Sequence, residues 1–156
     1  MGSGLSITGT LLERVRSLVL AEFPDGIRIH RDYDASLPDL HGDKEQLIQA
    51  VLNIARNAAQ ALEGKGQIEF RTRAARQVTL AKRRYKLALE LHVIDDGPGI
   101  PEELRERIFY PLVSGRDGGS GLGLTLSQTY VQYHHGTIEC DSKPGRTCFT
   151  IMLPLE

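Results

Sequence analysis

The stretch Asp43–Leu62, DKEQLIQAVLNIARNAAQAL, predicts one long amphipathic helix. Its apolar residues recur at helical spacing and form a wide face. Asp43 is a typical N-cap, and Gln46 three residues later completes a capping-box pattern. Gly64 and Gly66 follow the last turn. We therefore expect the helix to begin at Asp43 and to end near Leu62.

The segments on either side of this helix alternate between helical and strand patterns. Helices are expected at about Thr10–Phe23, Glu102–Phe109 and Leu122–His134, with Gly136 at the C′ position of the last. Strands are expected near Ile27–Arg31 and at Gln67–Arg73, Lys86–Ile94, Thr137–Asp141 and Thr147–Leu153. This order favours an α+β two-layer sandwich, in which a mixed sheet of about five strands packs on three main helices.

The composition bounds the function classes. The 156 residues include 19 basic and 20 acidic side chains, a net charge of −1, so nothing suggests a nucleic-acid binder. No apolar run is long enough to cross a membrane. Two cysteines, Cys140 and Cys148, allow neither a disulfide framework nor a four-thiolate zinc site, which favours a reducing, cytoplasmic setting.

The chain is expected to form a single domain. Residues 1–4 read as a cloning remnant. Residues 5–42 supply an N-terminal helix, strand and loop, and residues 43–156 carry the motifs described below.

Two asparagines, Asn53 and Asn57, lie one turn apart in the long helix. Asparagine is a poor residue for a helix interior, because its amide competes for backbone hydrogen bonds. The pair is either two solvated surface amides or a pair of amide oxygens that face a cleft as metal or phosphate ligands.

The loop DDGPGIP, residues 95–101, follows an apolar strand. A carboxylate at such a strand end can accept a hydrogen bond from a base edge, and the glycines let the backbone approach a ligand. An ordinary turn after a strand would have the same sequence.

A third motif, GGSGLGL at residues 118–124, leads into a helix. Glycines before a helix N-terminus expose backbone N–H groups to an anion. No Gly-Lys-Ser/Thr follows, so this is not a Walker A loop, and no strand precedes it, so it is not a dinucleotide fingerprint.

The window Arg71–Lys86 carries seven of the basic residues. It reads as the solvated tip of a hairpin, with a docking surface for an acidic partner as the alternative.

Taken together and in this order, the motifs resemble the ATP-binding domain of histidine kinases, in the superfamily shared with gyrase, Hsp90 and MutL ATPases. NIARNAAQAL matches its N box, DDGPGIP and GSGLGL its glycine boxes, IFYPLVSGRDGG its F box and ATP lid, and SKPGRTCFTIMLP its terminal turn and strand. The chain is most similar to nitrogen-regulation sensor kinases of the NtrB type, through RDYDASLPDL, RAARQVTLAKRRYKL and FYPLVSGRDGGSGLGL. The resemblance implies a Bergerat-type ATP-binding fold.

The resemblance also implies a role for each matching residue. Asn57 would coordinate Mg²⁺, with Asn53 beside it, and Arg116 in the lid would contact the γ-phosphate. Asp95 would accept from the adenine amino group, and Thr147 would join the water network around adenine. The base pocket would be shaped by Gly97, Gly99 and Ile100, and the phosphates would meet the amides of Gly119, Gly121, Leu122, Gly123 and Leu124.

The same resemblance favours a kinase over an ATPase. The ATPase branches place a glutamate, as general base, where this chain has Asn53. None of the five histidines is followed by an acidic residue, as the family's acceptor histidine is. We therefore expect the sensor and acceptor domains to be absent from this chain.

The implied partners are the acceptor-histidine dimerisation domain, a response regulator of the NtrC type and, as a further candidate, a PII-type regulatory protein. A non-enzymatic nucleotide-binding regulator and an anti-sigma-type serine kinase are the alternative functions.

Overall fold

The computed structural model describes residues 7–105 and 122–155. Their five strands form one sheet in the order β1-β2-β3-β5-β4. The strands are β1 (Ile27–Asp32), β2 (Gly66–Leu80), β3 (Arg83–Asp95), β4 (Thr137–Lys143) and β5 (Arg146–Pro154). β1 pairs with β2 in parallel, whereas the other neighbours are antiparallel. The sheet is therefore mixed, as expected.

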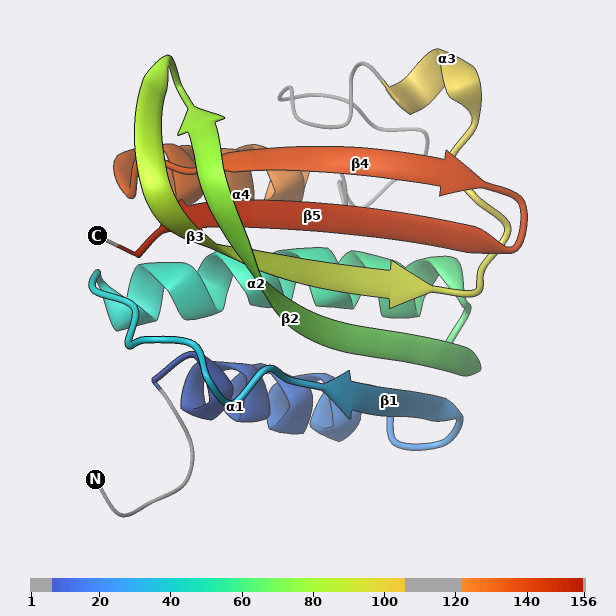
Figure 1. The fold of residues 1–156 in the computed structure, drawn as a ribbon. Coiled ribbons are helices and arrows are strands. Elements are labelled where there is room, and N and C mark those ends of the chain that lie inside the picture. The colour runs from blue at the N-terminus through green and yellow to red at the C-terminus, as the bar shows by residue number, and fades with distance from the viewer. Residues whose placement is uncertain (1–6, 106–121, 156) are drawn as a thin grey trace.

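Three long helices cover one face of this sheet (Figure 1). They are α1 (Ile7–Glu22), α2 (Lys44–Ala61) and α4 (Leu122–Tyr133), and a short helix, α3 (Glu102–Arg105), follows β3. The predicted α+β sandwich with three main helices is thus confirmed. None of the helices among the described residues is long and apolar enough to span a membrane.

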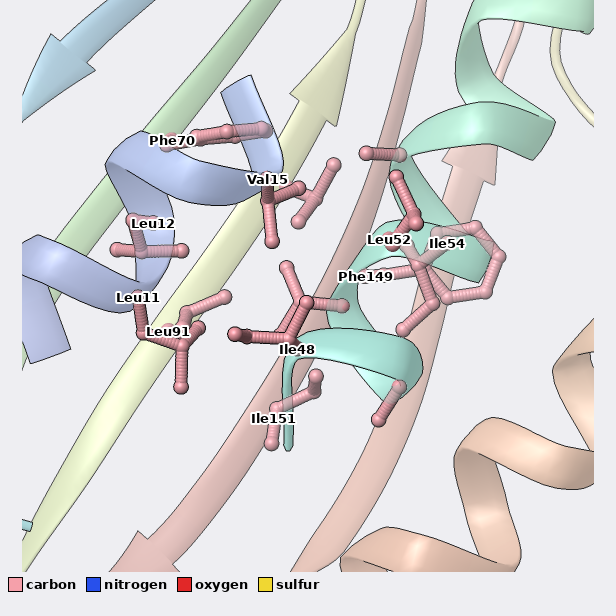
Figure 2. Close-up of a cluster of buried hydrophobic side chains, with 14 of the residues drawn as sticks. Leu11, Leu12, Val15, Ile48, Leu52, Ile54, Phe70, Leu91, Phe149 and Ile151 are labelled. Carbon is pink, nitrogen blue, oxygen red and sulfur yellow. The ribbon is translucent and has the colours of Figure 1, made fainter. Parts of the chain in front are cut away.

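The hydrophobic core lies between the helices and the sheet. Every second residue of the central strands points toward the helices and is buried: Ile68, Phe70, Leu89, Leu91, Val93, Phe149, Ile151 and Leu153. Leu12 and Val15 of α1 and Ile54 of α2 meet them (Figure 2). Burial stabilises such a core by roughly 25 cal/mol per Å² of apolar surface removed from water.

The start of α2 is the one that the sequence predicts. Asp43 has an extended backbone, and its carboxylate accepts a hydrogen bond from the Gln46 backbone N–H, at 3.1 Å. The cap satisfies a donor that the first turn leaves without a partner.

The β2–β3 hairpin differs from the expectation. A solvated tip was predicted between two short strands, but pairing continues to Leu80 and Arg83, and only the two residues Ala81 and Lys82 form the turn. Pairing over this length is supported by a second apolar cluster, separate from the main core. Its buried members are Ala75, Leu80, Tyr85 and Ala88, with Val78 and Met152 packed against them.

Arg71 and Arg73 of this window form ion pairs within the sheet. Arg71 lies 2.8 Å from Glu69, and Arg73 lies 2.7 Å from Asp32. The window also contains Arg76, Lys82, Arg83, Arg84 and Lys86, and the Arg83 guanidinium lies 5.3 Å from the centre of the Tyr85 ring. Docking of an acidic partner at this hairpin stays a prediction.

The end of α4 also departs from the expectation. The residue in the left-handed conformation after the helix is His135, with a φ of 64°, and not Gly136. Gly136 is required for another reason, because a Cβ there would overlap the Met152 carbonyl oxygen of β5. The glycine thus permits a close approach of the chain to the sheet.

Candidate functional site

Asp95 is the last residue of β3 and is buried, with 5% of its surface exposed. Its Oδ1 accepts a hydrogen bond from the Gly97 backbone N–H at 2.9 Å. The other carboxylate oxygen accepts no hydrogen bond from the residues that the structure describes. Asp95 therefore offers a buried acceptor to a ligand that brings a donor.

The surroundings of Asp95 disfavour its charged form. Burial raises the pKa of this carboxyl group, the Gly97 hydrogen bond opposes that shift, and the adjacent Asp96 adds to it. An N–H donor from a ligand would relieve part of the desolvation penalty. This makes a ligand donor more favourable here than at an exposed carboxylate.

The loop after Asp95 is fastened to the β4–β5 turn. Gly145 donates from its backbone to the Gly97 carbonyl oxygen at 2.9 Å. Gly99 has a φ of +91°, and a Cβ at this position would lie 2.8 Å from the Lys143 carbonyl oxygen. A side chain at position 99 would thus both strain the backbone and push the turn away, which explains this glycine.

Two buried hydroxyl groups complete this connection. The Ser142 Oγ accepts from the Ile100 backbone N–H at 2.7 Å and lies 2.7 Å from the Thr147 Oγ1. Thr147 is also the cross-strand partner of Asp95. The structure thus brings together the predicted residues Asp95, Gly97, Gly99, Ile100 and Thr147.

Ser142 and Asp96 support this site but are not among the predicted residues. The Asp96 carboxylate accepts from the Gln67 backbone N–H at 3.0 Å and so holds the loop to the start of β2. The second aspartate of DDGPGIP could have been found from the motif. Ser142 could not, because a serine within a strand gives no signal until its partners are known.

The two asparagines of α2 differ in their surroundings. Asn53 is buried, and its Oδ1 accepts from the Gln49 Nε2 at 3.0 Å, so it is not a solvated surface amide. Asn57 is half-buried, and its amide makes no hydrogen bond to a side chain within residues 7–105 and 122–155. Its oxygen therefore fits the role of a ligand for a hard cation such as Mg²⁺.

Helix α4 packs antiparallel to α2. At one end, His134 accepts from the Asp43 backbone N–H at 2.9 Å; further along, the Ser127 hydroxyl donates to the Ala50 carbonyl oxygen at 2.7 Å. Both helices advance by the same number of residues between these contacts. Continued in this way, the first turn of α4 lies beside the Asn53–Asn57 turn.

This packing directs the N-terminal end of α4 to the asparagines. The first backbone N–H groups of a helix have no partner within it, and they attract anions. Those groups belong here to Leu122, Gly123 and Leu124, and the Leu124 side chain is buried. The predicted residues Arg116, Gly119 and Gly121 lie outside the described residues.

The two halves of the candidate site meet at Leu62, the C-cap of α2. A Cβ on Gly97 would lie 3.2 Å from a Leu62 methyl group, so the end of α2 abuts the Asp95 loop. One half thus offers a buried acceptor, and the other offers amide oxygens and a helix N-terminus. This combination suits a ligand with a hydrogen-bonding base at one end and anionic groups at the other.

Comparison with known proteins agrees with this arrangement. A family model described as "Histidine kinase-, DNA gyrase B-, and HSP90-like ATPase" matches residues 42–156. The sensory histidine kinase/phosphatase NtrB of Salmonella typhimurium is 51% identical over 97% of this chain, and that of Rhodobacter capsulatus is 43% identical over 93%. The matches cover 45% and 42% of those relatives, so the chain spans less than half of their length.

Solved structures show the same fold. A mycobacterial sensor histidine kinase, MprB, matches with a TM-score of 0.74 and 27% identity, over 93% of this chain and 92% of that one. Full-length ShkA in complex with AMPPNP matches with a TM-score of 0.74 and 26% identity, over 93% of this chain and 29% of that one.

Proposed function

Since this chain belongs to the histidine kinase-, DNA gyrase B- and HSP90-like ATPase family, we propose that it is the catalytic domain of a nitrogen-regulation sensor histidine kinase. It binds Mg·ATP and transfers the γ-phosphoryl group to a histidine of a separate dimerisation domain. The observation that carries the proposal is the buried Asp95 carboxylate, which keeps an acceptor without a partner among the described residues.

Asp95 recognises the base of the nucleotide. An ionised carboxylate accepts from the adenine amino group, and a guanine carbonyl at the same place would put two acceptors against each other. Ser142 and Gly145 hold the surrounding loop in shape through Ile100 and Gly97. Thr147, fixed by Ser142, supplies a hydroxyl group next to Asp95.

The phosphates lie toward α2 and α4. Asn57 would hold Mg²⁺, and the ion would supply charge neutralisation for the phosphate oxygens. The first backbone N–H groups of α4 donate to the remaining phosphate oxygens, and Arg116 is proposed to contact the γ-phosphate from the lid.

Asn53 decides between phosphoryl transfer and hydrolysis. Its amide cannot take a proton from water, so the chain lacks a general base at the position where the ATPase branches carry a glutamate. ATP therefore stays intact until the imidazole nitrogen of the acceptor attacks the γ-phosphorus. A nitrogen–phosphorus bond then forms, the bond from phosphorus to the bridging oxygen breaks, and ADP leaves. Positioning and charge neutralisation provide most of the catalysis in such a transfer.

The acceptor histidine is proposed to belong to the separate dimerisation domain. His134 is engaged in the fold, since its ring lies between the Tyr130 carbonyl oxygen and the Asp43 N–H. The proposed partners are the dimerisation domain, a response regulator of the NtrC type whose aspartate takes the phosphoryl group, and a PII-type regulatory protein. The proposed setting is the cytoplasm, where ATP is available.

A phosphotransfer assay tests the proposal. The chain is mixed with a dimerisation-domain protein from a matching kinase, Mg²⁺ and ATP labelled at the γ-phosphate. We expect label on the acceptor that is lost in acid and kept in base, and none when the acceptor histidine is replaced. Acid-stable label would indicate a serine kinase instead, and ATP binding without any transfer would indicate a regulatory module.

Two variants assign the roles. Asn57→Asp adds a charge beside the phosphates and alters the metal geometry, so transfer should fall. Asn53→Glu restores the carboxylate of the ATPase branches, so phosphate release should rise while transfer falls. Rapid hydrolysis by the unaltered chain would contradict the kinase assignment.

A further inference from the structure

A polar cluster lies on the sheet face opposite the helices, outside the candidate nucleotide site. Phe149 and Ile151 of β5 point into the core, so Cys148 and Thr150, which alternate with them along the strand, point to the other face. His92 of β3 pairs with Thr150 across the strands, and Glu90 lies two residues from His92 on the same face. The β3–β5 pairing therefore assembles these four side chains.

The geometry is that of a nucleophile, a base and a carboxylate that orients the base. The Cys148 Sγ lies 3.6 Å from the His92 Nδ1 and 3.7 Å from the Thr150 Oγ1. The opposite ring nitrogen of His92, Nε2, lies 3.1 Å from the Glu90 Oε1. The His92 Nδ1 also lies 3.0 Å from the Thr150 Oγ1. When the ring is protonated, its Nδ1–H is therefore shared between the Thr150 hydroxyl and the sulfur, and its Nε2–H donates to the carboxylate. This order of groups is the one that activates thiols as nucleophiles.

We propose that Cys148 is a modification site, whose thiolate is stabilised by His92 and reacts with peroxides and small electrophiles. The site goes beyond nucleotide binding and phosphoryl transfer, and it involves no residue assigned to the nucleotide.

The charges around the cluster support this proposal. Burial raises the pKa of the Cys148 thiol, but the hydrogen bonds from His92 and Thr150, together with the charges of His92 and Arg146, bring the pKa below the ordinary value. The Cys148 hydrogen bond raises the pKa of His92 against burial, and Glu90 adds to this rise. Both directions favour a thiolate beside an imidazolium.

Neighbouring strands bring further charges to this face. Arg146 lowers the Cys148 pKa. Asp141 of β4 is the cross-strand partner of Cys148 and is exposed. The repulsion between its carboxylate and the Cys148 thiolate is therefore largely screened by solvent. On β2, Arg71 is opposite His92 and forms an ion pair with Glu69. Among these groups, His92 makes the shortest polar contact with the sulfur that the structure gives.

The reaction with a peroxide balances within this cluster. The thiolate sulfur attacks the terminal oxygen of the peroxide, so an S–O bond forms and the O–O bond breaks. Sulfur loses two electrons, the peroxide gains them, and the leaving alkoxide or hydroxide takes the proton of His92. The products are a sulfenic acid and an alcohol or water.

The second cysteine makes a matched control within the same chain. Cys140 is more exposed than Cys148, of which 8% is exposed, and it packs against the main core. Accessibility alone thus predicts faster reaction at Cys140, whereas activation predicts faster reaction at Cys148.

Alkylation of the unaltered chain with limiting iodoacetamide at pH 7, followed by peptide mass spectrometry, measures both rates at once. We expect Cys148 to react several-fold faster, because a thiol whose pKa lies below the ordinary value has a larger thiolate fraction at pH 7. Its rate should also rise with pH through a midpoint below the roughly 8.5 of a free thiol. Equal rates, or faster reaction at Cys140, would overturn the proposal.

His92→Gln separates activation from packing. Glutamine can still hydrogen bond but carries no charge, so we expect the Cys148 rate to fall several-fold and its midpoint to rise, while the Cys140 rate and the melting temperature stay unchanged. An unchanged Cys148 rate would contradict the role of His92. If this variant fails to fold, the pH profile of the unaltered chain still decides the question.

A peroxide arm tests the modification itself. Hydrogen peroxide followed by dimedone, which traps sulfenic acids, should label Cys148 in the unaltered chain and in Cys140→Ser. The label should be missing in Cys148→Ser. Label on Cys140 alone, or on neither cysteine, would overturn the proposal.

Discussion

The two ends of β3 are built in opposite ways. At Asp95 the strand ends on a buried carboxylate, and hydrogen bonds to the β4–β5 turn hold the following loop. At Arg83 the strand begins at the turn of the β2–β3 hairpin. Strand pairing and the second apolar cluster, which includes Leu80 and Tyr85, hold this hairpin in place. The Asp95 end keeps a buried polar group that lowers stability until a ligand forms a hydrogen bond with it. The hairpin end stabilises the fold without any ligand.

This contrast implies that substitutions at the two ends have separable effects. Changes near Asp95 should alter nucleotide affinity more than the free energy of unfolding, and changes in the hairpin should do the reverse. Each prediction below therefore pairs a binding measurement with a stability measurement.

Asp95→Asn should have the largest effect on binding. The amide oxygen can still accept from Gly97, but the NH₂ group then faces another donor on adenine. Loss of a hydrogen bond to a charged group corresponds to about 1.5–3 kcal/mol, so ATP affinity should fall by about ten- to a hundredfold. Calorimetric titration with Mg·ATP measures this change.

The same variant should be no less stable without nucleotide. Because the folded-state pKa of Asp95 is raised, its ionised form at neutral pH lowers the free energy of unfolding. Urea unfolding at pH 7 provides the check. A large loss of stability with unchanged affinity would mean that Asp95 is a structural residue.

Tyr85→Ala should have the opposite effect, because it should lower stability and leave ATP affinity unchanged. Tyr85 is buried in the hairpin cluster, and the Arg83 guanidinium lies 5.3 Å from its ring centre. Its removal should lower the free energy of unfolding by about 2 kcal/mol, toward the lower end for large apolar side chains because the cluster is small. ATP affinity should not change. Tyr85→Phe, which keeps the ring, is the matched control and should be near neutral.

Ser142→Ala should lower both stability and ATP affinity, with a smaller effect on affinity than Asp95→Asn has. It removes the acceptor of the Ile100 N–H and the partner of Thr147, and an unsatisfied buried group costs about 1–3 kcal/mol. Ser127→Ala is the control, because Ser127 is buried and hydrogen-bonded to Ala50, away from the Asp95 loop. Both variants should lose similar stability, but only Ser142→Ala should bind ATP more weakly, by several-fold. Equal affinities in the two variants would refute the positioning role of Ser142.

The smallest expected effect is on the pH dependence of binding. Asp95 accepts from adenine only when ionised, and its pKa in the free chain is raised. ATP affinity should therefore begin to fall at a higher pH than for an exposed aspartate. Titrations from pH 7 to pH 4 compare the unaltered chain with Asp95→Asn, which corrects for the titration of ATP itself. If ATP affinity depended on pH in the same way in both proteins, Asp95 would not take part in binding.

Local signals in the sequence predicted much of this structure. The Asp43 cap and the apolar face of α2 depend on neighbouring residues, so the helix could be placed to within a residue. Asp95, Gly97 and Gly99 stood out because the loop needs their particular chemistry. The hairpin was underestimated because a basic stretch hid the apolar residues that pair across its strands.

Long-range contacts set the limit of such prediction. Ser142 acquires its role only when β4 brings it to Ile100, 42 residues away in the chain. His92 and Cys148 are 56 residues apart and meet only through the β3–β5 pairing. Gly136 was assigned to a helix end, whereas its packing on β5 requires the glycine. These residue types are common, so only their partners reveal what they do.

The central claim is that the end of β3 at Asp95 binds ATP, with its phosphates toward α2 and α4. A titration of the ¹⁵N-labelled chain with Mg·ATP, followed by amide chemical shifts, tests it directly. We predict saturable shifts at residues 95–100 and 147, at residues 53–57 and at the start of α4, with little change at residues 76–86 of the hairpin. Shifts confined to the hairpin, or the absence of saturable shifts around Asp95, would contradict the account.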